Sequence, residues 1–112
     1  MSQRDNFFNI DTLKQGISRN LSEGMTTRVF AGAQAMISIV RIEPGKSGEI
    51  HSHPQEQWGF CVQGSGLRMQ GGEQIEVAAG DFWRTPGNVE HGFTAGADGA
   101  VIDDVFAPPR DE

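Results

Sequence analysis

The sequence has few of the features that mark secreted, membrane or nucleic-acid-binding proteins. It contains one cysteine, Cys61, and no tyrosine. A single cysteine excludes an intrachain disulfide, which favours a reducing compartment. No apolar run approaches the roughly 18 residues that a membrane-spanning helix needs, and the first residues show no apolar segment typical of a signal peptide. We therefore expect a soluble cytoplasmic protein with no membrane partner.

Positive charge is also scarce. The 112 residues include 9 Lys and Arg against 15 Asp and Glu, a formal net charge of −6. Phosphate recognition needs clustered positive charge, so neither nucleic acid nor an anionic membrane surface is an expected partner. The length suits one domain over residues 1–112, which buries about two thirds of its unfolded surface.

Glycine, in contrast, is abundant. Fifteen glycines are spread along the chain and separate short runs rich in Val, Ile, Phe and Thr. Short strands with regular turn signals predict an all-β fold, a sandwich or a barrel. The expected strands are residues 26–31, 35–42, 57–63, 67–70, 74–78, 81–85, 93–95 and 100–106.

Two local signals refine this prediction. Gly71-Gly72 lies between two expected strands and predicts a hairpin. Asp11 is placed to cap a single helical turn over residues 12–15, which Gly16 would end. No segment shows a 3.6-residue apolar period over three turns, so no longer helix is expected.

The three histidines predict a metal site. His51 and His53 are two residues apart, so on an extended strand their imidazoles point to the same face. His91 follows a Pro-Gly turn and can add a third nitrogen from a neighbouring strand, and Gln57 can add an oxygen. The alternative is that these are surface histidines at strand ends.

The spacing around these residues resembles that of small single-domain cupins. The resemblance rests on two motifs with regular intervals, made of Gly45, His51, His53, Gln57 and Gly64, then Gly80, Pro86 and His91. It implies a cupin-type jelly-roll β-barrel with a divalent metal in its mouth. The chain departs from the usual motifs at Gln57, normally Glu, at Asn88, normally Gly, and at Ala95, normally Asn.

Glutamine at position 57 affects the metal chemistry. Three imidazoles and an amide leave a divalent ion its full charge, which favours an anionic ligand over dioxygen activation. Glu56 could compete as the ligand, but strand alternation puts it on the other face. That face holds Glu56, Trp58, Phe60 and Val62, whereas the cavity face holds Gln57, Gly59, Cys61 and Gln63. The apolar face is covered either by the chain's own core or by a second subunit, and a homodimer is our prediction.

Residues 101–110, together with residues 16–19 and 51–57, resemble the KdgF-type cupins. That family is linked to pectin and alginate degradation, and the resemblance implies linearisation of 4,5-unsaturated uronate monomers to open-chain 5-keto-4-deoxyuronate. It implies a metal held by His51, His53, Gln57 and His91. It further implies that Asp104 acts as acid and base, that Phe106 packs against the sugar, and that Arg110 takes part in catalysis and substrate binding. Asp103 is the alternative acid, one residue away.

Other interpretations remain open at this stage. The chain could be another cupin enzyme, an oxygenase or a lyase, or a non-enzymic sugar-binding cupin. The neutral ligand set weakens the oxygenase case, and the lack of tyrosine excludes a lyase with a tyrosine base. Asp103, Asp104, Asp111 and Glu112 could instead form a solvated acidic end. Nickel, zinc, manganese and iron(II) all accept these ligands. We interpret Arg84 as outward-facing and Cys61 as a packing residue, and assign no role to Arg41 or Arg68.

Overall fold

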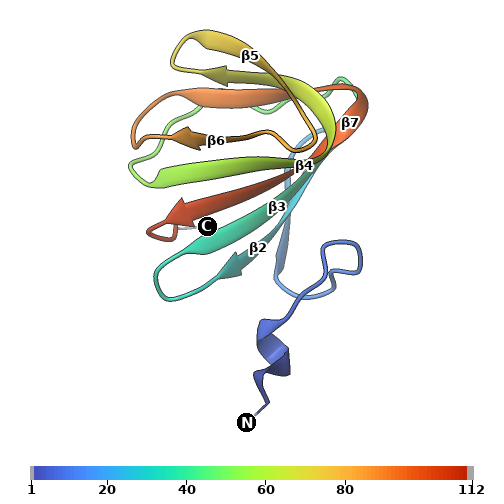
Figure 1. The fold of residues 1–112 in the computed structure, drawn as a ribbon, viewed down its shortest axis with the longest axis vertical. Helices are drawn as coiled ribbons and strands as arrows, with labels where there is room; N and C mark the ends of the chain where they lie inside the picture. Colours follow the sequence, from blue (N-terminus) through green and yellow to red (C-terminus); the bar gives the residue numbers. More distant parts are fainter. Residues whose placement is uncertain (1, 111–112) are drawn as a thin grey trace.

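Antiparallel strands make up nearly all of the regular structure in the computed structural model, which describes residues 2–110 (Figure 1). A short 3-10 helix precedes them. The elements are η1 (Gln3–Asn6), β1 (Ile17–Ser22), β2 (Met25–Ala31), β3 (Met36–Ile42), β4 (Glu56–Gln70), β5 (Glu73–Ala78), β6 (Phe82–Thr85) and β7 (His91–Ala107). The predicted all-β class is confirmed.

The two long strands, β4 and β7, organise the fold. They pair antiparallel from Glu56↔Ala107 to Gln70↔His91, with register shifts after Cys61 and Gly64. The strand order is β1-β2-β3-β7-β4-β5, and β6 pairs with the first part of β4. The sheet bends where the register shifts, so its two halves face each other as a jelly roll, with β5 at one end and β2 at the other in Figure 1. The predicted cupin-type barrel is confirmed.

Position 64 lies at this bend, and only glycine fits there, for two reasons. Its φ is +81°, in the left-handed region that disfavours other residues. A Cβ at this position would also collide with the main-chain oxygen of Gly99 on β7. The two strands can therefore approach each other at the bend only because no side chain stands between them.

Gly64→Ala is accordingly expected to destabilise the protein more than Gly45→Ala. Gly45 has a similar φ of +73° but open space around its Cβ position. Both variants should lose about 1–2 kcal/mol from the backbone conformation, and Gly64→Ala about 1–3 kcal/mol more from the clash. Denaturant unfolding of the metal-free proteins measures the difference. Equal losses would mean that the strands separate at Gly64 without cost.

Three features differ from the sequence prediction. β1 was not expected at all. The predicted strands 57–63 and 67–70 are parts of one strand, β4, and 93–95 and 100–106 are parts of β7. The glycines between these segments were interpreted as turn signals, but glycine also permits bulges within a continuous strand. The hairpin at Gly71-Gly72 is confirmed, with both glycines at positive φ.

The helical turn predicted over residues 12–15 is wrong, because these residues are not helical and the short helix is η1 instead. Side chains from the sheet bind the carbonyl groups on either side of that segment. Arg41 donates to the Ile10 carbonyl at 2.7 Å, and Arg28 donates to the Gln15 carbonyl at 3.1 Å. These contacts hold the segment against β2 and β3.

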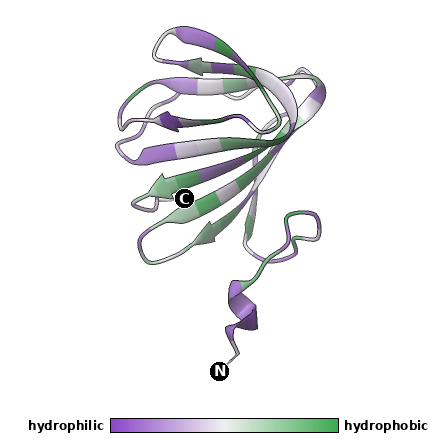
Figure 2. Cartoon of the chain, in the orientation of Figure 1, coloured by the Kyte–Doolittle hydropathy of each residue, from purple (hydrophilic) through white to green (hydrophobic). Residues whose placement is uncertain are grey.

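The core lies between the two halves of the sheet. Its larger cluster contains Val40, Ile42, Cys61, Phe93, Ala95, Ala100 and Ile102, and a smaller one contains Val29, Met36 and Phe106. Cys61 is fully buried, in keeping with the predicted packing role. Figure 2 shows that β3 and the adjacent end of β7 carry much of the apolar sequence. Among residues 2–110, no helix has the length and apolar character needed to cross a membrane.

Candidate metal centre

The three histidines meet between the two halves of the sheet. His91 begins β7, and an isolated antiparallel bridge pairs it with His51. The imidazole of His53 lies 4.9 Å from that of His91 and 5.7 Å from that of His51, measured between ring centroids. One nitrogen from each ring lies within 4.8 Å of the others. Residues up to 40 positions apart in the sequence thus present their nitrogens to one point.

Main-chain carbonyls fix the orientation of all three rings. The Nδ1 atoms of His51, His53 and His91 lie 3.1, 3.0 and 2.8 Å from the carbonyl oxygens of Glu49, Gln55 and Val89. A carbonyl only accepts, so each Nδ1 carries the proton and donates it. A neutral ring protonated at Nδ1 carries its lone pair on Nε2, which is the form that binds a metal.

The remaining polar atoms fit a divalent cation. His91 Nε2 is buried and has no hydrogen-bond partner. His53 Nε2 lies 2.9 Å from Gln57 Oε1, so these two ligand-type atoms face the same space. Burial lowers the pKa of His53 and lowers that of His91 to about 4, which keeps both rings neutral. Three imidazole nitrogens and one amide oxygen would hold the ion.

A cavity of about 440 Å³ opens beside these ligands. This volume is typical of small-molecule sites. Its walls come from both halves of the sheet, and they include His51, Gln57, His91, Asp104, Phe106 and Arg110. The residues named from the sequence therefore lie around one cavity, apart from His53, which is buried beside Gln57.

The two neighbouring aspartates face opposite sides of β7. Asp104 shares the cavity face with Ile102 and Phe106. Asp103 lies across from Phe60, on the outer face. Burial raises the pKa of Asp104 to about 6, against the effects of the Arg68 charge and a hydrogen bond with Gln57, and burial also raises the pKa of Asp103. Only Asp104 is placed to meet a ligand in the cavity.

Phe106 and Arg110 form one wall of the site. Phe106 is buried, and its ring centroid lies 5.4 Å from that of His53. The guanidinium of Arg110 lies over the Phe106 ring at 5.3 Å. Asp104 and Arg110 thus belong to the cavity and not to a solvated tail. Asp111 and Glu112, which the tail interpretation included, lie outside the described residues.

Comparison with known proteins agrees with this geometry. A family model described as a cupin domain matches residues 38–102. The chain belongs to the cupin family. No curated protein sequence gives a significant match.

Solved cupin structures extend the likeness over most of the chain. KdgF from Halomonas sp. matches with a TM-score of 0.81 and 25% identity over 94% of both chains. An RmlC-like cupin from Shewanella frigidimarina matches with a TM-score of 0.79 and 23% identity over 88% of both chains. A deletion mutant of Bacillus subtilis oxalate decarboxylase has a TM-score of 0.77 and 23% identity, covering 87% of this chain but 28% of that one. The predicted resemblance to KdgF-type small cupins is confirmed.

Arg84 and Arg68 lie on different sides of the sheet in this cupin. Arg84 is exposed and forms an ion pair with Glu56 at 3.3 Å, so both lie on the outer face, as predicted. Arg68, to which the sequence analysis assigned no role, lines the cavity beside the three histidines, which we call the metal-side cavity. Its neighbours Leu67 and Met69 are apolar, a pattern that suggests an outward arginine.

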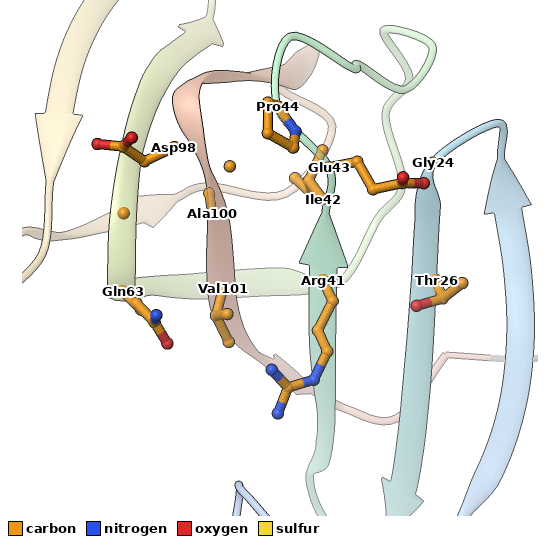
Figure 3. A pocket seen from close by; sticks show the side chains of 12 residues that line it. Gly24, Thr26, Arg41, Ile42, Glu43, Pro44, Gln63, Asp98, Ala100 and Val101 are labelled. Carbon is orange, nitrogen blue, oxygen red and sulfur yellow. The ribbon is translucent and has the colours of Figure 1, made fainter.

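A second pocket in this cupin lies away from the histidines. It has a volume of about 230 Å³, and its lining includes Arg41, Glu43, Pro44, Gln63 and Asp98. Figure 3 shows that the charged ends of Arg41, Glu43 and Asp98 point in different directions. Gln63 was expected on the same face as Gln57, and the register shift after Cys61 moves it outward. Because its charges diverge, this pocket is a weaker candidate site.

Gln57 connects the metal ligands of this cupin to Asp104. Its Oε1 faces His53, and its side chain also hydrogen-bonds Asp104. An ionised carboxylate only accepts, so the Gln57 amide group is the donor to it. A glutamate, the usual cupin residue, could not make that donation when ionised.

Gln57→Glu is therefore expected to separate metal affinity from activity. The added charge should tighten metal binding by about tenfold, equivalent to 1.4 kcal/mol, and should place a like charge beside Asp104. Turnover should fall because the metal is less electrophilic and Asp104 is harder to ionise. Chelator competition measures the first effect, and an activity assay the second. Unchanged affinity and activity would mean that position 57 does not bind the metal.

Proposed function

We propose that this protein is a metal-dependent isomerase that opens the ring of 4,5-unsaturated uronate monomers from pectin or alginate in the cytoplasm. The observation that carries the proposal is the position of Asp104, in a cavity bounded by the candidate metal ligands. The structural likeness to KdgF supports it. Phe106 and Arg110, on the same wall, supply an apolar face and a cation for an acidic sugar.

The reaction is an isomerisation and needs no oxidant or reductant. The C1 hydroxyl loses a proton, a C1 carbonyl forms, and the bond from C1 to the ring oxygen breaks. Its electron pair passes to that oxygen as an enolate, and C4 gains a proton to give the 5-keto, 4-deoxy product. A bound divalent ion would supply Lewis-acid stabilisation of the carboxylate and enolate oxygens.

Asp104 is the group we propose for both proton transfers. Ionised, it accepts the C1 hydroxyl proton, and then it delivers a proton to C4. Its pKa of about 6 is closer to neutral pH than that of an exposed aspartate, which suits a group that must gain and lose a proton in one cycle. The hydrogen bond from Gln57 orients its carboxylate.

The ultraviolet absorbance of the conjugated double bond reports this reaction directly. Metal-loaded protein should accelerate loss of the absorbance of an unsaturated uronate monomer, and chelation should abolish the acceleration. Binding of the uronate without turnover would favour a non-enzymic cupin. Absence of turnover by folded, metal-loaded protein would remove the ring-opening proposal.

We also propose that the chain forms a homodimer through the outer face of β3, β7, β4 and β6. Trp58 and Phe60 are 45% and 43% exposed, so the chain's own core does not cover them. Ile37 and Phe82 extend the same apolar face. A twofold axis can pair such a face with itself. Light scattering should give a dimer mass that Phe60→Asp converts to a monomer, and a monomeric wild type would contradict the proposal.

A further inference from the structure

Arg68 is a buried cation held rigidly at the edge of the metal-side cavity. It is 5% exposed and lies near the end of β4. Its Nη2 donates to Thr85 Oγ1 at 2.8 Å, and its Nε donates to Gln70 Oε1 at 3.3 Å. Thr85 Oγ1 in turn donates to the same Gln70 oxygen at 2.8 Å. These three side chains form a closed network that fixes the guanidinium plane.

The rest of the surroundings strengthen this support. Gln70 donates to the Arg84 carbonyl at 2.8 Å, which anchors the network to β6. The Arg68 guanidinium carbon lies 5.5 Å from the centre of the Trp83 ring. Gln70, Thr85 and Trp83 are not part of the cavity lining, whereas Arg68 is. The supporting residues therefore contact the guanidinium from outside the cavity, and its cavity side stays open to a ligand.

No carboxylate within residues 2–110 forms a close ion pair with Arg68. The ion pairs there are Lys46–Glu23 and Arg84–Glu56, both away from this cavity. Asp104 is near enough to interact with Arg68 electrostatically, but the two do not form an ion pair. A buried charge that lacks a close counter-ion is costly. An anionic ligand in the cavity would remove that cost.

From this arrangement we propose that Arg68 binds the substrate carboxylate together with the metal and so selects acidic over neutral sugars. The inference rests on the proposed function for the identity of the substrate as a uronate. The hydrogen bonds to Thr85 and Gln70 use Nη2 and Nε, which leaves Nη1 available to the ligand. Arg110 has a different place, since it lies over Phe106 and not in the Gln70–Thr85 network.

Calorimetry with two saturated sugars tests this inference without turnover. D-Glucuronate carries the carboxylate and D-glucose does not, and neither contains the double bond needed for the reaction. Metal-loaded wild type should bind D-glucuronate more tightly than D-glucose. Arg68→Met should weaken D-glucuronate binding by about tenfold to a hundredfold, with metal content and D-glucose binding unchanged. Arg68→Lys should restore little, because an ammonium lacks the planar fork.

The network gives a second variant in case Arg68→Met does not fold. Thr85→Val removes one hydrogen bond but keeps the arginine, so D-glucuronate affinity should fall by a smaller factor. Wild-type affinity in Arg68→Met or in Thr85→Val, or no preference for D-glucuronate in wild type, would overturn the inference. If binding depends on Arg68 but no ring opening occurs, the proposed function is wrong and the Arg68 inference stands. If Arg68→Met opens the unsaturated uronate with a wild-type KM, the Arg68 inference is wrong and the proposed function stands.

Discussion

Asp104→Asn is expected to lower kcat for uronate ring opening by about a hundredfold to ten-thousandfold, the range for loss of a general acid or base. Asparagine keeps the shape of the side chain but cannot accept and return a proton. Asp104 faces the cavity and hydrogen-bonds Gln57, so the substitution acts at the reacting atoms and not on the fold. The rate of absorbance loss at saturating substrate measures the effect.

Asp103→Asn is the matched control for this experiment. It makes the same chemical change one residue away, on the outer face opposite Phe60. Its activity should stay within about twofold of wild type in the same assay, because it cannot reach the cavity. Since one Asp103 oxygen is buried without a hydrogen-bond partner, the amide should also be tolerated by the fold. An active Asp104→Asn together with an inactive Asp103→Asn would reverse the assignment.

His91→Ala is expected to weaken metal binding by more than about a hundredfold. Loss of an outer partner of a ligand already costs roughly ten- to a hundredfold in affinity, and His91 would be a direct ligand. Its Nε2 is buried without a hydrogen-bond partner in the protein, so its removal leaves the set of metal ligands incomplete. Chelator competition and elemental analysis after dialysis measure the loss, and ring opening should fall in parallel.

Val89→Ala is the control for the His91 substitution. The Val89 carbonyl, not its side chain, accepts the hydrogen bond from His91 Nδ1. The truncation therefore preserves the contact that orients the imidazole, and metal affinity should not change. If His91→Ala retained full metal affinity with a native fold, the ion would bind elsewhere in the chain.

The sequence was sufficient to bring the candidate ligands together because short-range rules place most of them. His51 and His53 are close in the chain, and Gln57 lies on the strand that follows. The regular spacing that resembles cupins then brings in His91. Asp104 and Asp103 could be separated only by the alternation of β7, whose start and bend were not predictable from the sequence.

Arg68 could not be assigned for the same reason. Alternation counted from Gln57 fails after Cys61 and again after Gly64, where the register with β7 shifts. Local sequence gives no help either, because apolar neighbours such as Leu67 and Met69 are typical of an arginine that faces solvent. Its burial depends on Thr85 and Gln70, which the β4–β6 arrangement brings together from separate segments. Long-range hydrogen bonds of this kind leave no periodic signal in the chain.

The main-chain acceptors behind the three imidazoles affect how such a protein can evolve. The oxygens that orient the rings belong to the backbone of Glu49, Gln55 and Val89. A substitution changes a side chain but does not delete a carbonyl, so mutational drift at these three positions leaves the ring tautomers intact. Lineages can therefore exchange the side chains beside the three histidines and reshape the cavity while keeping the imidazoles in the same orientation.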